Sequence, residues 1–103
     1  MGKIMETKDS YLKKMKAKFD DLNYKWNIER NKLETKAQEV KVEVKKKFDE
    51  KLEDIEEWRE QMRKKLDQID NATVEAWSDI KEGADRAWKS LNEAINKARS
   101  YFD

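Results

Sequence analysis

Cysteine, histidine and proline are absent from this sequence, and its only glycines are Gly2 and Gly83. Without cysteine the chain has no disulfide or thiol chemistry, and without cysteine and histidine it lacks the commonest ligands for zinc, copper and iron. The absence of histidine also removes the side chain that most often serves as a general base near neutral pH. We therefore expect no enzyme, no metal site and no cofactor.

The scarcity of proline and glycine leaves few residues for tight turns and sheet connections. Hydrophobic residues make up 37% of the chain and charged residues 46%, against about 25% charged residues in an ordinary globular domain. The formal net charge is only +1, however, and the chain holds four tryptophans, three tyrosines and three phenylalanines, which favours order over disorder. We therefore expect an all-α protein built from long, well-solvated helices.

The hydropathy and charge patterns argue against a bilayer interior and against nucleic acid. No apolar run approaches the roughly 20 residues that a helix needs to span a membrane, and the N-terminus lacks the apolar stretch of a signal peptide. We therefore expect a cytoplasmic protein. The basic cluster at residues 13–18 is followed directly by Asp20 and Asp21, and on a helix its lysines point in several directions. We therefore do not expect nucleic-acid binding.

An acidic cluster lies in the middle of the chain, at Glu53, Asp54, Glu56, Glu57 and Glu60. Carboxylates at this spacing could offer oxygen ligands to calcium or magnesium, but the glycine-containing loop of a calcium-binding motif is missing. Arg59 and Arg63 can neutralise these carboxylates, so we predict a surface of ion pairs. Paired carboxylates can act as acid and base only around a cleft, and no pattern in the sequence indicates a small-molecule substrate.

Apolar residues follow one another at helical spacing through the first two thirds of the chain. The first stripe has steps of three, four or seven residues, with a polar interruption near Glu29, and consists of Leu12, Met15, Phe19, Leu22, Trp26, Leu33, Ala37 and Val40. It continues through Val44, Phe48, Leu52, Ile55, Met62, Leu66 and Ile69. Residues 34–39 contain no proline, glycine, asparagine or aspartate to favour a turn. The pattern therefore predicts one long helix over residues 8–69.

Residues 70–72 carry the chain's clearest signal for a turn. Asp70, Asn71 or Thr73 can accept a hydrogen bond from the free amides at the start of a following helix. We therefore predict a second helix over residues 73–102.

This second helix repeats itself every eleven residues, at 73–80, 84–91 and 95–102. Eleven residues make three helical turns at about 3.67 residues per turn, so the repeat draws one nearly straight apolar stripe. The stripe consists of Val74, Trp77, Ile80, Ala84, Trp88, Leu91, Ile95, Ala98 and Phe102. Because such a stripe must be buried, the surface that covers it is the central question about function.

These elements fit a single all-helical domain over residues 1–103, folded as an antiparallel hairpin or coiled coil. If the second helix pairs with residues 40–69, the stripe from Leu12 to Leu33 stays uncovered in a monomer. We therefore predict self-association, most simply as a homodimer that completes a four-helix bundle. The alternative is a monomeric three-helix bundle, which needs a further turn between Asn23 and Asn31.

We predict that the protein acts through helix packing, as a structural or interaction protein. The predicted packing face consists of Leu12, Met15, Phe19, Leu22, Trp26, Leu33, Trp77, Ile80, Trp88, Leu91, Ile95 and Phe102. The alternative is an amphipathic protein on a membrane surface, because eleven-residue repeats and interfacial tryptophans both suit a helix in a headgroup layer. Residues 70–103 hold seven acidic and five basic residues, so anionic lipid would repel this part of the chain, and we favour helix packing over a membrane partner.

Two tryptophan-containing segments give the chain a family resemblance. They read Ala76-Trp77-Ser78-Asp79-Ile80-Lys81-Glu82-Gly83 and Ala87-Trp88-Lys89-Ser90-Leu91, after a charged helix that opens with Tyr11-Leu12-Lys13-Lys14-Met15. In these segments the chain resembles a family of small bacterial coiled-coil proteins, some described as stress-associated. The resemblance implies a helical, cytoplasmic, non-enzymatic protein without catalytic residues, and it suggests a role in stress. The eleven-residue period is also similar to that of late-embryogenesis-abundant proteins, from which the many aromatic residues set this chain apart.

Overall fold

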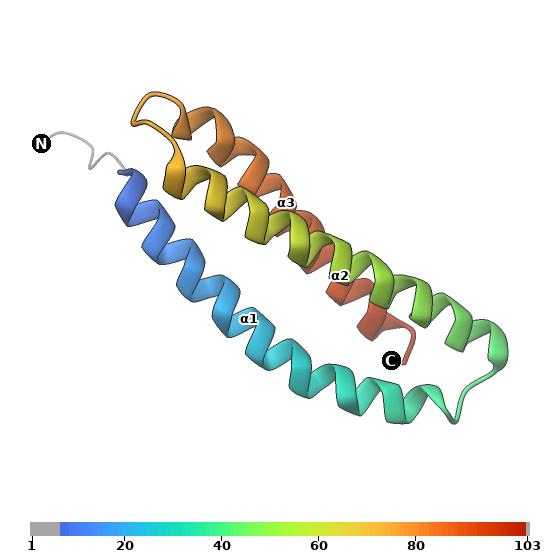
Figure 1. The fold of residues 1–103 in the computed structure, drawn as a ribbon. Coiled ribbons are helices and arrows are strands. Elements are labelled where there is room, and N and C mark those ends of the chain that lie inside the picture. Colours follow the sequence, from blue (N-terminus) through green and yellow to red (C-terminus); the bar gives the residue numbers. More distant parts are fainter. Residues whose placement is uncertain (1–6, 103) are drawn as a thin grey trace, which may run out of the picture.

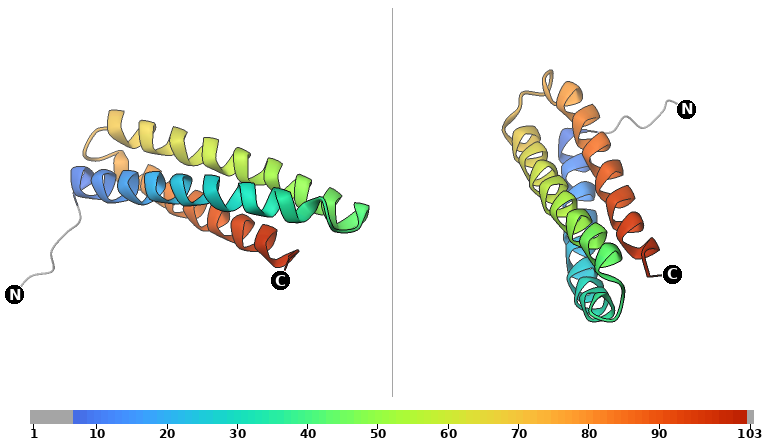
Figure 2. Two further views of the ribbon diagram at one scale, coloured as in Figure 1. Left: turned by 90° about the horizontal axis from the view of Figure 1, so that it is seen from below. Right: turned by 90° about the vertical axis from the view of Figure 1, so that its right-hand side faces the viewer.

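The computed structural model describes residues 7–102, and every regular element in that part of the chain is a helix. Helix α1 spans Lys8–Ala37, α2 spans Val42–Asn71 and α3 spans Trp77–Ser100. The helices run alternately up and down and lie side by side in an elongated bundle of 55 × 24 × 19 Å (Figure 1, Figure 2). The predicted all-α class is confirmed, and the packing is that of a three-helix bundle.

The long helix predicted over residues 8–69 is wrong, because the chain turns back at residues 38–41. The amides of Gln38 and Glu39 each donate to the carbonyl three residues earlier, at 3.3 and 3.0 Å, so ordinary backbone hydrogen bonds close the end of α1. Lys41 then adopts an extended conformation, with φ −60° and ψ 148°, and α2 starts without a side-chain cap. None of these contacts needs a glycine or a proline.

Tertiary packing, more than turn chemistry, accounts for this first connection. Val40, Val42 and Val44 fall close together there, and β-branched residues lower helix propensity. Folding back allows α1 and α2, each 30 residues long, to bury their apolar stripes in one core. The three-helix alternative placed this turn between Asn23 and Asn31, and that segment lies inside α1.

The second connection lies close to the predicted turn. Helix α2 ends at Asn71, and the Thr73 hydroxyl accepts a hydrogen bond from the Ala76 amide at 3.1 Å. The Thr73 carbonyl accepts a second bond from the Trp77 amide, also at 3.1 Å. Thr73 therefore acts as a cap, as predicted, but it caps the turn ahead of α3, which begins at Trp77 instead of at residue 73.

All three helices build the core of the bundle. The buried side chains are Tyr11, Leu12, Met15, Phe19, Trp26, Leu33 and Ala37 from α1, Phe48, Ile55, Met62, Leu66 and Ile69 from α2, and Trp77, Ala84, Ala87, Leu91, Ala94, Ile95 and Ala98 from α3. Most of the stripe from Leu12 to Leu33 is therefore covered within one chain. The uncovered stripe was the reason for predicting a dimer, so self-association now needs another surface.

Buried residues along α3 also follow a seven-residue spacing, at Trp77, Ala84, Leu91 and Ala98. Of the three alanines in the eleven-residue repeat, Ala87 and Ala98 are buried, whereas Ala76, which lies just ahead of α3, is exposed. Small side chains allow helix axes to approach closely. Helix α3 packs most extensively against α2, and the contact between α1 and α3 is the least extensive of the three. Because α1 and α3 make the least contact, a groove remains between these two helices.

Candidate interaction surfaces

The packing face predicted from the sequence lies mostly inside the bundle. Its buried members are Leu12, Met15, Phe19, Trp26, Leu33, Trp77, Leu91 and Ile95, and its half-buried members are Leu22, Ile80, Trp88 and Phe102. Most of these side chains pack helix against helix within one chain. Two of the half-buried ones, Leu22 and Trp88, line a groove between α1 and α3.

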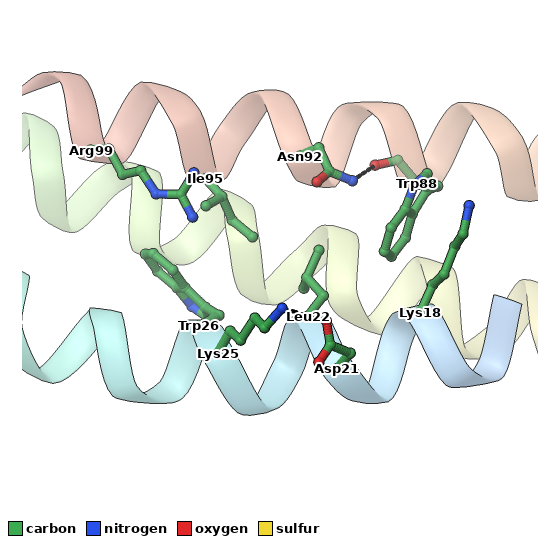
Figure 3. Close-up of a pocket in the computed structure, with 9 residues that line it drawn as sticks. All are labelled: Lys18, Asp21, Leu22, Lys25, Trp26, Trp88, Asn92, Ile95 and Arg99. Atoms are coloured by element: carbon green, nitrogen blue, oxygen red, sulfur yellow. Dashed lines mark hydrogen bonds and ion pairs between the residues drawn. The ribbon is translucent and has the colours of Figure 1, made fainter.

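This groove, called the α1–α3 groove, has a volume of about 360 Å³. It is lined by Lys18, Asp21, Leu22, Lys25 and Trp26 from α1, and by Trp88, Asn92, Ile95 and Arg99 from α3. Figure 3 shows Trp26 and Trp88 projecting from opposite helices into the space between them, with Leu22 at an intermediate level. The groove therefore combines two indole rings and two aliphatic side chains with a polar rim.

Polar contacts fasten α1 to α3 near both ends of the groove. At one end the Tyr11 hydroxyl donates to Asp85 Oδ1 at 2.6 Å. At the other end the Arg99 guanidinium donates to both carboxylate oxygens of Glu29, at 2.5 and 2.7 Å. The fold thus explains the polar interruption near Glu29, because at this level α1 meets a charged partner on α3 instead of an apolar one.

The rim of the groove carries more positive than negative charge. Lys25 pairs with Asp21 at 3.0 Å, and Arg99 pairs with Glu29 outside the groove. Lys18 forms no ion pair with any residue in the part of the chain that the structure describes. Figure 3 shows its side chain extending from α1 toward α3, on the stretch of the groove that also holds Trp88.

The indole N–H of Trp26 is buried, and within residues 7–102 it meets no hydrogen-bond acceptor. A buried donor without a partner costs about 1–3 kcal/mol. Trp26 is nonetheless only 2% exposed, so the packing of its large ring outweighs that cost. The ring therefore acts as an apolar wall at its end of the groove.

A second feature lies on the outer side of α2 and α3 and is centred on Trp58, whose side chain is 37% exposed. A hollow of about 380 Å³ at this position is lined by Lys51, Asp54, Trp58, Ser90, Glu93, Ala94 and Lys97. Glu57 and Gln61 adjoin Trp58 on the α2 side. These residues together form what we call the Trp58 face.

The acidic cluster of α2 is neutralised by neighbouring basic residues. Glu56 pairs with Arg59 at 2.7 Å, and Glu60 pairs with Arg63. The hydrogen bond from Arg63 to Glu60 raises the pKa of that guanidinium. The predicted surface of ion pairs is confirmed. Within residues 7–102 no three acidic side chains form a group that could hold a metal ion.

Sequence reasoning identified the apolar lining of the groove but missed its polar rim and the Trp58 face. The missed rim residues are Lys18, Asp21, Lys25, Asn92 and Arg99. They lie beside the apolar stripes, and only the fold brings the two halves of the rim together. The polar interruption at Glu29 was the one signal that a charged partner sits at that level. Trp58 was not part of the predicted face.

The described helices also differ from membrane-spanning ones, because none between residues 7 and 102 is both long enough and apolar enough to cross a bilayer. Comparisons with protein-family models, with curated proteins and with solved structures found no match for this chain. The family resemblance carried by the two tryptophan segments therefore stays a prediction.

Proposed function

We propose that the protein is a non-enzymatic helical interaction protein that self-associates through the Trp58 face. The observation that carries this proposal is the exposure of Trp58, at 37%, whereas Trp26 and Trp77 are 2% and 9% exposed. Tryptophan is among the residues that contribute most to binding when they are buried at the centre of an interface. Association through this face buries the ring without opening the bundle.

The charges on the Trp58 face suit a second copy of the same chain. Figure 1 shows that α2 and α3 are antiparallel. Lys51 and Lys97 therefore lie at one end of the face, and Glu57 and Glu93 lie further along toward the other end. In a dimer with two-fold symmetry the same patch meets itself in the reverse direction. The lysines of each copy then approach the acidic residues of the other, so the face is complementary to itself.

This dimer differs from the four-helix bundle expected from the sequence. That arrangement needed a hairpin with the stripe from Leu12 to Leu33 uncovered, but those residues lie in or against the core of a three-helix bundle. The proposed assembly consists of two such bundles side by side. The family resemblance alone suggests a role in stress, and for that reason we include this role in the proposal.

The alternative function, binding to a membrane surface, requires α3 to leave the bundle. Its residues Trp77, Leu91 and Ile95 are buried, so lipid would have to replace protein contacts that are already made. This burial favours an intact bundle over membrane binding. Tryptophan emission measured with and without lipid vesicles separates the two, since a strong blue shift on vesicles favours the membrane alternative and an unchanged spectrum favours the bundle.

Self-association is tested by sedimentation velocity over micromolar to millimolar concentrations, with the wild type and Trp58→Gln. We expect a dimer for the wild type and a monomer for the variant, with equal helicity because Trp58 lies outside the core. Tyr24→Gln is the matched control, since Tyr24 is 69% exposed and belongs to α1. A wild type that stays monomeric, or a dimer that survives Trp58→Gln, contradicts the proposal.

The charge argument has its own test, in which two variants each carry charge of one sign. The first combines Lys51→Glu with Lys97→Glu, and the second combines Glu57→Lys with Glu93→Lys. Each variant alone should be monomeric because like charges would then face each other across the two-fold axis. An equal mixture should form a heterodimer. Homodimers of either variant that are as stable as the wild type would refute the two-fold arrangement.

A further inference from the structure

The α1–α3 groove has the size and the lining of a small-molecule site. Its volume of about 360 Å³ falls within the roughly 300–1,000 Å³ that is common for ligand pockets. Leu22 and Trp88 are apolar but only half-buried, and both line this groove. The groove shares no lining residue with the Trp58 face, so the inference below does not depend on the proposed dimer.

The packing of α3 keeps this groove open. The side of α3 that faces α2 includes several small residues, since Gly83 lies beside Lys65 of α2, and Ser90 and Ala94 border the hollow next to that helix, together with the longer Glu93 and Lys97. On the side that faces α1 the side chains are large, with Trp88 and Ile95 in the groove. Helix α3 therefore sits close against α2, while its bulky side chains hold it away from α1.

Polar contacts join α1 to α3 near both ends of the groove. The bond between Tyr11 and Asp85 lies beyond Trp88, and the bond between Arg99 and Glu29 lies beyond Ile95. Between these contacts the helices stay separated by the rings of Trp26 and Trp88 (Figure 3). The site is thus formed before any ligand binds, which lowers the entropic cost of binding.

The charges of the rim favour an anion. Among the lining residues, Lys18, Lys25 and Arg99 are cationic and Asp21 is the one acid. Asp21 is engaged by Lys25 at 3.0 Å, and Lys18 forms no ion pair within residues 7–102. The Lys18 ammonium is therefore available to a negatively charged group at the polar rim of the groove.

We propose that the α1–α3 groove binds a small organic anion, whose flat or elongated apolar body lies against Leu22 and Trp88 and whose acidic group pairs with Lys18. Burial of the apolar body supplies most of the affinity, because the half-buried surfaces of Leu22 and Trp88 are then removed from water. The ion pair with Lys18 selects acids over neutral molecules of the same shape.

Binding is tested on the full chain with anilinonaphthalene sulfonate, which joins a flat apolar body to one acidic group. Probe fluorescence reports affinity, and the indole N–H signals in NMR spectra report the place of binding. We expect saturable binding of one probe per chain, shifts at Trp26 and Trp88, and no shift at Trp58. Phenylnaphthylamine, a similar neutral molecule, should bind about two- to fivefold more weakly, because it lacks the exposed ion pair.

Two matched pairs of variants locate the site. Lys18→Gln should weaken binding of the sulfonate about two- to fivefold and leave binding of the neutral analogue unchanged. Lys13→Gln removes the same charge from an exposed position on the same helix outside the groove and should change neither. Trp88→Ala should weaken both probes by at least about fivefold, while Trp58→Ala should have no effect. Lys18 is an exposed side chain, so its variant tests the site without risk to folding.

Competition with other acids defines the class of ligand more closely. Displacement of the sulfonate probe by dodecanoate supports the proposal and indicates a chain-like, fatty-acid type of ligand. Displacement by naphthoate alone also supports it and indicates a flat aromatic acid. The proposal is overturned if neither the sulfonate nor the two acids bind saturably, if the neutral analogue binds as tightly as the sulfonate, or if Lys13→Gln weakens binding as much as Lys18→Gln does.

Discussion

Replacing Tyr11 with phenylalanine removes the hydroxyl that fastens α1 to α3 and leaves a ring of nearly the same shape. Tyr11 is 1% exposed, and its hydroxyl donates to Asp85 Oδ1 at 2.6 Å, within the range of charge-assisted bonds. Such bonds contribute about 1.5–3 kcal/mol to stability. The Asp85 side chain is 50% exposed, so water competes for it, and we expect a loss of about 1.5 kcal/mol, near the lower end of that range.

The expected loss corresponds to a fall of about 6–12 °C in Tm for a domain of this size. Urea and thermal denaturation followed by circular dichroism should be measured for Tyr11→Phe, Asp85→Ala and the double variant. The double-mutant cycle should give a coupling free energy of about 1 kcal/mol. Tyr24→Phe is the control, because Tyr24 is 69% exposed, and its effect should stay within about 0.5 kcal/mol. A coupling free energy near zero would refute the view that this bond holds the two helices together.

Three further substitutions test the packing and the helix ends, each by urea denaturation. Gly83→Ala should raise the free energy of unfolding by about 0.5–1 kcal/mol, because its new Cβ would meet the flexible end of Lys65 at 3.4 Å; a loss of stability would show that the two helices are closer than described. Lys41→Asp should raise the free energy of unfolding by about 0.5–1 kcal/mol, since α2 starts without a side-chain cap. Thr7→Ala removes the cap of α1 and should lower the free energy of unfolding by about 1 kcal/mol. Changes of the same sign and size in the two variants would contradict the capping argument. Ala84→Leu should lower the free energy of unfolding by about 1–3 kcal/mol, because Ala84 is fully buried, and a neutral effect would mean that the core has room there.

The apolar spacing of the sequence predicted the helical class and the buried faces, because burial follows helical periodicity wherever a helix packs. The start of α1 at Lys8 and the end of α2 near residue 70 were also predicted well. The turn at residues 38–41 was missed, because it is closed by ordinary backbone bonds and contains none of the residues that favour turns. One weak signal was present, since the β-branched Val42 lies between Val40 and Val44 but off their helical stripe.

The candidate surfaces were harder to predict than the fold. An apolar stripe shows that a helix face is buried, but it does not show what covers it. The sequence therefore assigned the stripe from Leu12 to Leu33 to a second copy, although α2 and α3 of the same chain cover it. The contact between Glu29 and Arg99 joins residues 70 positions apart, and such a pair follows only from the relative placement of two helices.

The order of large and small residues along α3 contains information that a division into apolar and polar residues discards. That division places Ala84, Trp88 and Ile95 on one stripe, although their volumes differ greatly. Sorted by volume, α3 presents a small side, which includes Gly83 and Ala94, to α2, and a large side with Trp88 and Ile95 to α1. Since the bulk of contacting side chains sets the distance between helix axes, this order predicts one close neighbour and one distant neighbour. The α1–α3 groove results from the greater distance between α3 and α1. The volumes of the side chains therefore indicate the groove, whereas their hydropathy does not.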